Sequence, residues 1–230
     1  DQVNGRVPVV AGTASTATDQ AIQLSKSAED AGADGVLIVP PYYYKATEEE
    51  IYQHYKAVSD AIDIPIMLYN NPWVCGYYVY PDLVARMAKD GIIQYVKETH
   101  GDLAYVHESI QKAGKHLTLF FGRDENSFEA FMAGAQGWVS GAANLVIEME
   151  SEIFNLVKAG KIDKARDKYY KVLPFFYLTE RKGRWIARVK AGLKMMGRDA
   201  GDPKPPLLPL NKEELAELRK ILVQIGLLSQ

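Results

Sequence analysis

Cysteine is nearly absent from this chain of 230 residues, because Cys75 is the only one. A disulfide within the chain is therefore impossible, which is typical of a protein from a reducing compartment. Four histidines are present, but none has the spacing of a metal site and no HExxH pattern occurs. We therefore expect a cytoplasmic protein that uses no metal and no cofactor.

An excess of charge of one sign is also missing, and so are long apolar runs. The formal net charge is −2, so nothing favours binding to nucleic acid or to an acidic membrane surface. No apolar run is long enough to span a bilayer, and no secretory signal pattern is present. We expect neither nucleic acid nor a membrane as a partner. The 47% of apolar residues is ample for a buried core.

The sequence does contain an alternation of short apolar runs with longer amphipathic runs. Six such pairs follow one another, with most strand starts roughly 25–30 residues apart, the size of a βαβ repeat. The short runs are almost continuously apolar, which is typical of a parallel sheet covered on both faces. The predicted strands lie at residues 7–13, 35–39, 65–69, 92–99, 117–122 and 137–141.

Strand patterns stop after residue 160. Helical periodicity continues over residues 162–173 and 182–196, and a Pro-rich crossing at 203–209 precedes a last helix over 213–225 with Asn211 as its N-cap. We therefore divide the chain into a sheet domain, residues 1–160, and a C-terminal helical extension, residues 161–230.

Two architectures accommodate repeated βα units. A doubly wound open sheet that binds nucleotides would need a Gly-rich turn, and neither GxGxxG nor GxxxxGK[ST] occurs. A (β/α)8 barrel is the other, and six of its units are visible here. A barrel two units short has two open edges, which is unfavourable. Either the chain starts inside a longer barrel, or something else closes the gap. We predict the α/β class and a (β/α)8 TIM-barrel type, with six βα units visible in this chain.

One lysine, Lys97, ends a predicted apolar strand. The C-terminal ends of parallel strands share one rim, where active sites of such folds lie, and Tyr69 and Tyr43 fall at neighbouring strand ends. An amine partly removed from water loses its proton more readily, attacks a carbonyl and forms an imine, while a phenol shuttles protons. The pattern leaves alternatives open: Lys97 could pair with Glu98, and the tyrosines could serve packing.

Five segments together resemble the dihydrodipicolinate synthase / N-acetylneuraminate lyase family, at residues 31–35, 41–43, 69–72, 96–98 and 207–210. The resemblance runs over nearly the whole chain. It implies a class I lyase that forms a Schiff base with a 2-oxo acid, on a (β/α)8 barrel with a C-terminal helical extension. It also implies a homo-oligomer, a dimer or a tetramer.

The resemblance assigns roles to seven residues. Lys97 matches the lysine that forms the imine with pyruvate or another 2-oxo acid, Tyr69 the general acid/base, and Tyr43 the tyrosine that reaches in from a neighbouring subunit. The remaining four match substrate-binding positions, one lining the pocket with its main-chain carbonyl and three on the loop facing the second substrate: Val139, Gly122, Arg123 and Asp124.

Three departures from the family pattern bear on the substrate. Family members begin with two further βα units, carrying a Gly-Thr-Thr-Gly-Glu-type loop that holds the 2-oxo acid carboxylate. Val74 stands where dihydrodipicolinate synthases carry an arginine for the aldehyde substrate's carboxylate. The run Asn70-Asn71-Pro72 is closer to the sugar-acid branches. We therefore predict an aldolase, or a dehydratase or deaminase, of a 2-oxo-3-deoxy sugar acid or similar compound.

Three alternatives remain at this point. One is dihydrodipicolinate synthase itself, and another is a non-catalytic fragment or assembly scaffold that keeps Lys97 as a relic. The weakest is a phosphate-binding barrel enzyme with an anion site at the small-residue turn 141–143.

Overall fold

A six-stranded parallel sheet forms the centre of the first part of the chain. A computed structural model describes residues 2–229. The strands lie in sequence order, each hydrogen-bonded to the next, so β1 and β6 are the sheet's two edges within the described residues. The strands are β1 (Val10–Gly12), β2 (Gly35–Ile38), β3 (Ile66–Asn70), β4 (Tyr95–Glu98), β5 (Thr118–Phe121) and β6 (Gly137–Trp138). Sequential parallel order is that of βα-barrel strands, which confirms the predicted α/β fold class.

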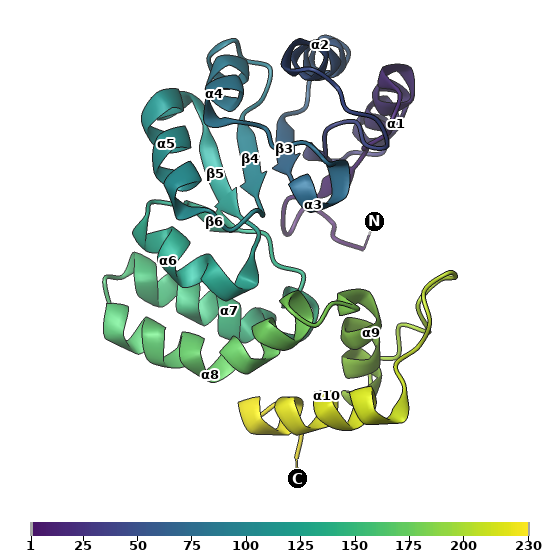
Figure 1. Ribbon diagram of the computed structural model, residues 1–230, viewed down its shortest axis with the longest axis vertical. Helices are drawn as coiled ribbons and strands as arrows, with labels where there is room; N and C mark the ends of the chain where they lie inside the picture. Colours follow the sequence, from purple (N-terminus) through teal and green to yellow (C-terminus); the bar gives the residue numbers. More distant parts are fainter. Residues whose placement is uncertain (1, 230) are drawn as a thin grey trace. The chain divides into compact units, whose positions relative to one another are not determined.

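Helices follow the strands as the repeat predicts, and α4 and α5 lie beside one another next to β4 and β5 (Figure 1). The side of the sheet that meets them is apolar, since Leu68, Val96 and Leu119 are completely buried. The helices of this part are α1 (Thr18–Asp30), α2 (Glu48–Ser59), α3 (Pro72–Cys75), α4 (Pro81–Lys89), α5 (Leu103–Ala113), the 3-10 turns η1 (Gly114–His116) and η2 (Asp124–Asn126), and α6 (Ser127–Met132).

Two compact units are distinguished by packing. The first runs to Gly122 and takes in residues 129–139, and the second comprises residues 123–128 and everything from Ser140 onward. The predicted boundary at residue 160 is drawn from where strand patterns end, and it stays a prediction.

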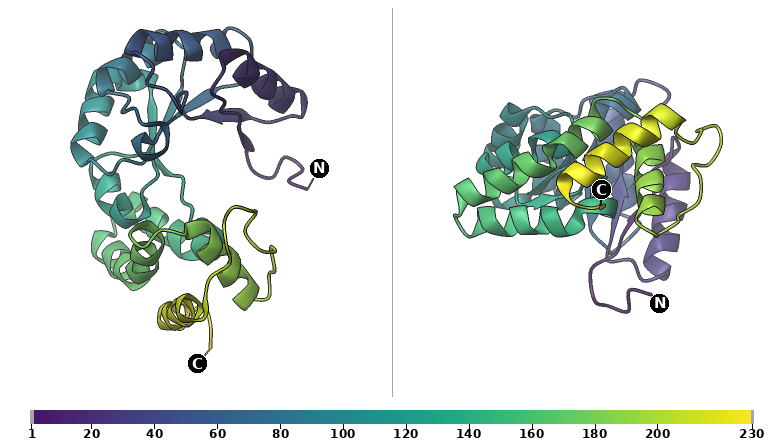
Figure 2. Two further views of the ribbon diagram at one scale, coloured as in Figure 1. Left: turned by 45° about the vertical axis from the view of Figure 1, so that its right-hand side comes forward. Right: turned by 90° about the horizontal axis from the view of Figure 1, so that it is seen from below.

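The second unit is helical, with α7 (Ala143–Lys158), α8 (Ile162–Glu180), α9 (Trp185–Met195) and α10 (Lys212–Ile225). Helix α8 packs against both α7 and α10, and α10 lies beside one end of α8 in the view from below (Figure 2). The centre of this packing is apolar and completely buried at Val172, Phe175, Phe176, Leu218 and Leu222.

Two helix limits in this unit differ from the predicted ones. The prediction ends a helix at residue 173, before Pro174, and is wrong: α8 continues to Glu180, because buried Phe175 and Phe176 extend its apolar face beyond the proline. The next predicted helix starts at 182, but α9 begins at Trp185. Gly183 and Arg184 have φ of +65° and +55°, which is incompatible with a right-handed helix.

Predicted helix starts are confirmed where side chains cap them. Thr47 accepts the Glu50 N–H and the Glu50 side chain accepts the Thr47 N–H, which makes a complete capping box at α2. Asn211 and Glu214 do the same for α10. Such caps satisfy backbone donors that have no partner inside the helix.

Removing the cap hydroxyl of α2 tests this account. Thr47→Ala should lower the free energy of unfolding by about 1 kcal/mol, the usual effect of losing an N-cap oxygen. Urea denaturation followed by circular dichroism measures it. Thr47→Ser keeps the hydroxyl and should unfold like the parent, so an equal loss in both variants would contradict the capping role.

Candidate active site around Lys97

Lys97 and Tyr69 are neighbours across the sheet. They lie on β4 and β3 and are direct partners in the parallel register. Both are half-buried, and the Lys97 Nζ lies 4.1 Å from the centroid of the Tyr69 ring. An amine over the face of a phenol is attracted by the ring quadrupole when it is protonated. The geometry thus brings the predicted nucleophile and the predicted proton carrier together.

The Tyr69 hydroxyl is oriented by the residue that follows β3. Asn71 donates a hydrogen bond from Nδ2 to the Tyr69 hydroxyl oxygen, at 3.0 Å. Since that oxygen accepts from the amide, its own proton is directed elsewhere. A phenol held in this way can donate to a group beside Lys97, which is the geometry that proton transfer requires.

Lys97 does not pair with Glu98, the alternative left open by the sequence. Successive residues of a strand point to opposite faces, and no ion pair joins the two side chains in the described part of the chain. Glu98 is instead completely buried and accepts hydrogen bonds from Asn70 Nδ2 at 2.6 Å and from the His100 N–H at 2.5 Å. Burial raises the pKa of Glu98 to about 7, although these hydrogen bonds oppose the shift.

Gly122 lies immediately beside the Lys97 side chain. A Cβ at this position would be 2.5 Å from the Lys97 Cε and 2.5 Å from the Thr99 Oγ1, closer than real Cβ contacts. The residue directly follows β5 and its N–H donates to the Glu98 carbonyl at 2.6 Å. Only glycine leaves room for the lysine stem to pass, which places this predicted site residue against Lys97.

Two other predicted residues lie at strand ends of the first unit. Val139 follows β6, is half-buried, and its N–H donates to the Phe121 carbonyl at 2.9 Å. Tyr43 follows β2 and is 98% exposed, with a φ of +87° that is unusual for a residue with a side chain. The roles expected for both remain predictions.

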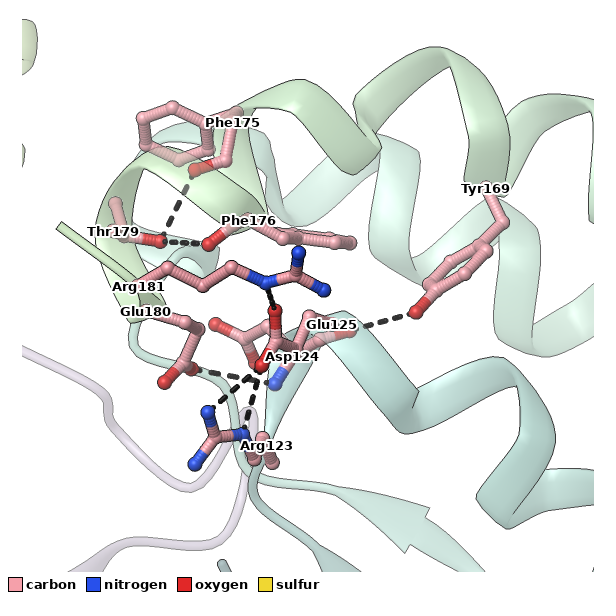
Figure 3. Close-up of polar contacts among 9 residues, drawn as sticks. All are labelled: Arg123, Asp124, Glu125, Tyr169, Phe175, Phe176, Thr179, Glu180 and Arg181. Carbon is pink, nitrogen blue, oxygen red and sulfur yellow. Dashed lines mark hydrogen bonds and ion pairs between the residues drawn. The ribbon is translucent and has the colours of Figure 1, made fainter. Parts of the chain in front are cut away.

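Arg123 and Asp124 belong to the second unit and are tied into it (Figure 3). The Arg123 guanidinium binds Glu125 at 2.8 Å, and Arg181 binds the other Glu125 oxygen at 2.5 Å. Burial alone would raise the pKa of Glu125, but the two arginines hold it below its ordinary value. Their expected contact with a second substrate is likewise a prediction.

Asp124 is buried and its surroundings are acidic. Its side chain accepts the Ala142 N–H at 3.3 Å, and its N–H donates to Glu180 at 3.4 Å. Glu150 is also buried, accepting a hydrogen bond from the Ser140 hydroxyl at 2.6 Å. Burial, assisted by the charge of Asp124, raises the pKa of Glu150 to about 8.

An aromatic stack beside the site was not predicted from the sequence. Trp73, in the short helix α3, stacks on His100 with ring centroids 5.6 Å apart and an interplanar angle of 17°, and Tyr78 meets the same imidazole edge-on. Trp73 is 69% exposed and Val74 is exposed as well. The tyrosine-rich run at 77–80 is conspicuous in the sequence. Its pattern does not indicate that Tyr78 contacts His100.

Within residues 2–229, no three His, Cys, Asp or Glu side chains are grouped so that they could hold a metal ion. None of the helices described there combines the length and the apolar character needed to cross a membrane.

Fold and site together define a class: parallel βα-barrel proteins with a lysine and a tyrosine on adjacent strand ends. Comparison with known proteins identifies the family within this class. The profile of the dihydrodipicolinate synthetase family matches residues 1–225. The chain belongs to that family.

Named relatives support the assignment to this family. Proteins named 4-hydroxy-tetrahydrodipicolinate synthase from Syntrophobacter fumaroxidans and Thermodesulfovibrio yellowstonii are 37% and 39% identical, over 99% and 94% of this chain and 78% and 75% of theirs. The dihydrodipicolinate synthase of Acinetobacter baumannii, solved with pyruvate, superimposes with a TM-score of 0.94 at 32% identity, covering 98% of this chain and 77% of its own. A putative dihydrodipicolinate synthetase from Pseudomonas aeruginosa gives 0.93 at 32%, covering 97% and 77%.

These names do not support the predicted kinship with the sugar-acid branches, and they favour the synthase alternative instead. The structure explains why the sequence misled. Asn70 is completely buried and binds Glu98 and the Val79 N–H, while Asn71 binds Tyr69. Both asparagines thus have hydrogen-bond partners within the protein.

Adding a methyl group at Gly122 tests the close approach to Lys97. Gly122→Ala should destabilise the protein by about 1–3 kcal/mol, as overpacking does, and should change the rate at which acetic anhydride modifies Lys97. Urea denaturation and peptide mass mapping measure these. Gly12→Ala, where a Cβ meets nothing within 4 Å, is the matched control and should alter neither. Equal behaviour of the two variants would contradict the packing described.

Removing the buried charge at Glu150 should change how stability depends on pH. Because the pKa of Glu150 is raised on folding, its contribution to stability is complete below about pH 4.5 and is lost as pH rises through about 8. Glu150→Gln should therefore flatten the fall in melting temperature over this window and melt higher than the parent at pH 8.5. The exposed neighbour Glu148 gives the control: Glu148→Gln should keep the parent slope.

Proposed function

We propose that this protein is a lyase that forms a Schiff base between Lys97 and pyruvate. The Lys97 amine attacks the ketone carbon, water leaves, and the protonated imine withdraws electrons from the neighbouring methyl carbon. Loss of a proton from that carbon gives an enamine, which can add to an aldehyde carbonyl. The observation that carries the proposal is the placement of the Lys97 Nζ 4.1 Å from the Tyr69 ring, on directly paired strand residues.

Tyr69 is the proton carrier in this proposal. Its hydroxyl accepts from Asn71, so its proton is available to the departing water or to the developing alkoxide. A phenol that donates and then recovers one proton serves both imine formation and carbon–carbon bond formation. The lysine supplies the covalent bond and the tyrosine moves protons, which divides the chemistry between β4 and β3.

For the second substrate we favour an aldehyde over a sugar acid. The relatives named 4-hydroxy-tetrahydrodipicolinate synthase support this choice, and a solved relative is described with pyruvate bound. Val74, however, offers no positive charge where the family's synthases carry an arginine for the aldehyde's carboxylate. We therefore propose pyruvate as the first substrate and an aldehyde as the class of the second.

We further propose that the protein works as a homo-oligomer. Tyr43 is almost fully exposed and is held at a φ of +87°, a conformation that is unfavourable unless something else compensates it. The family resemblance makes this the tyrosine that enters a neighbouring subunit's site, where it would extend the relay that begins at Tyr69.

Reductive trapping tests the function directly. Incubation with pyruvate and sodium borohydride should attach one reduced pyruvate to the chain, and peptide mass mapping should place it on Lys97. Lys97→Arg retains the charge and should give no adduct. Tyr69→Phe keeps the ring but loses the proton carrier, so it should slow trapping about 100-fold, within the range of general acid–base catalysis.

The possible outcomes separate the hypotheses. An adduct on Lys97 with pyruvate, but not with 2-oxo-3-deoxy sugar acids, supports the synthase-like function. An adduct that forms with the sugar acids alone would support a sugar-acid lyase and contradict the proposal. A folded protein that gives no adduct with either would leave only the non-catalytic scaffold.

A further inference from the structure

The residue pair Asn70–Glu98 is the last rung of the β3–β4 ladder, and it directly follows the pair Tyr69–Lys97. Tyr69 pairs with Lys97, and the next pair along both strands is Asn70 with Glu98, where both strands end. Because side chains alternate along a strand, Asn70 and Glu98 project to the side opposite Lys97 and Tyr69. Both are completely buried, and a 2.6 Å hydrogen bond joins them.

The directions of three hydrogen bonds in this rung are determined. The Val79 N–H donates to Asn70 Oδ1 at 3.1 Å, so the Asn70 amide must turn its Nδ2 toward Glu98. One Glu98 oxygen accepts from this Nδ2 and the other from the His100 N–H at 2.5 Å. Both carboxylate oxygens are therefore acceptors, and neither position suits a donor.

Backbone hydrogen bonds tie the same rung to its surroundings. The Thr99 N–H donates to the Asn70 carbonyl at 3.1 Å, and the Gly122 N–H donates to the Glu98 carbonyl at 2.6 Å. Gly122 in turn is the residue against which the Lys97 stem packs. A shift of Glu98 would consequently move the strand end that carries Lys97 and the wall beside it.

We propose that Glu98 is a positioning residue, whose buried carboxylate locks the last rung of the β3–β4 ladder and thereby sets the approach of Lys97 to Tyr69. This inference rests on the proposed function, because it concerns the same lysine. Glu98 itself does not touch the substrate. It prevents the strand ends from fraying, so that the amine and the phenol stay in contact.

The rung offers an unusually sharp test, because its amide and its carboxylate can be exchanged. Glu98→Gln alone keeps the size of the side chain but turns an NH2 group toward the NH2 group of Asn70. Asn70→Asp alone sets two carboxyl groups against each other. In the double variant, the carboxylate introduced at position 70 accepts from the Val79 N–H and from the amide introduced at position 98. The oxygen of that amide accepts from the His100 N–H. The bonds from the Val79 and His100 N–H groups are therefore kept, and the bond between the two side chains is restored with its direction reversed.

The measurement is the rate of borohydride trapping by pyruvate at increasing pyruvate concentration. Each single variant should lower the maximal rate about tenfold, because the misplaced amine reaches the reacting geometry less often, with the half-saturating pyruvate concentration within about twofold of the parent. The double variant should return to within about threefold of the parent. A Glu98→Gln variant as fast as the parent, or a folded double variant as slow as the singles, would overturn the proposal.

Two controls separate positioning from stability and from the function itself. Glu29 also joins two elements, accepting the N–H groups of Asp63 and Ile64 at 2.7 and 3.1 Å, but it lies away from Lys97. Glu29→Gln should therefore lower the unfolding midpoint without changing the trapping rate. Acetylation of Lys97 by acetic anhydride reports its surroundings without an imine. If the parent gives no pyruvate adduct, the proposed function fails, while acetylation that changes in the single variants and recovers in the double variant would still establish the rung's effect on Lys97.

Discussion

The parallel pairing of β3 with β4 is the constraint from which the site follows. Tyr69 and Lys97 are opposite one another only in this register, and a slip by one residue would turn one side chain to the other face of the sheet. Leu68 and Val96, next to these residues, are completely buried, and a slip would turn one of them to the face that carries Lys97 and Tyr69. Apolar packing on one side of the sheet thus decides which polar groups meet on the other.

Buried carboxyl groups are a second constraint on the structure, and two kinds of contact compensate their burial. Glu125 is held ionised by Arg123 and Arg181, so its burial is compensated by opposite charge. Glu98 and Glu150 have no such cation among their described ion-pair partners and depend on hydrogen bonds alone, which compensate desolvation only in part. Their raised pKa values follow from this difference. A carboxylate is retained at Glu98 despite this penalty, which agrees with a requirement for two acceptors at one point.

Much of the scaffold could be predicted because it depends on local chemistry. Apolar runs of strand length gave the six strands, and Thr47 and Asn211 gave two helix starts, since a cap involves only four consecutive residues. Lys97 was found because a lysine at the end of an apolar strand is conspicuous. The partner of Glu98 could not be found in this way, because strand alternation shows the face of a side chain but not its contact 28 residues away.

The proposed function assigns chemistry and substrate selection to different parts of the chain. The lysine and the tyrosine belong to paired strands, where movement of one residue disturbs the hydrogen bonds of its neighbours. Trp73 and Val74 lie just beyond β3 in α3, a single turn that ends at Gly76 with a φ of +67°. Both are exposed, so replacing them changes the surface beside the candidate site without repacking the sheet. Under the proposed function, the turn after β3 sets the preference among aldehydes, and the β3–β4 pair carries out the covalent step.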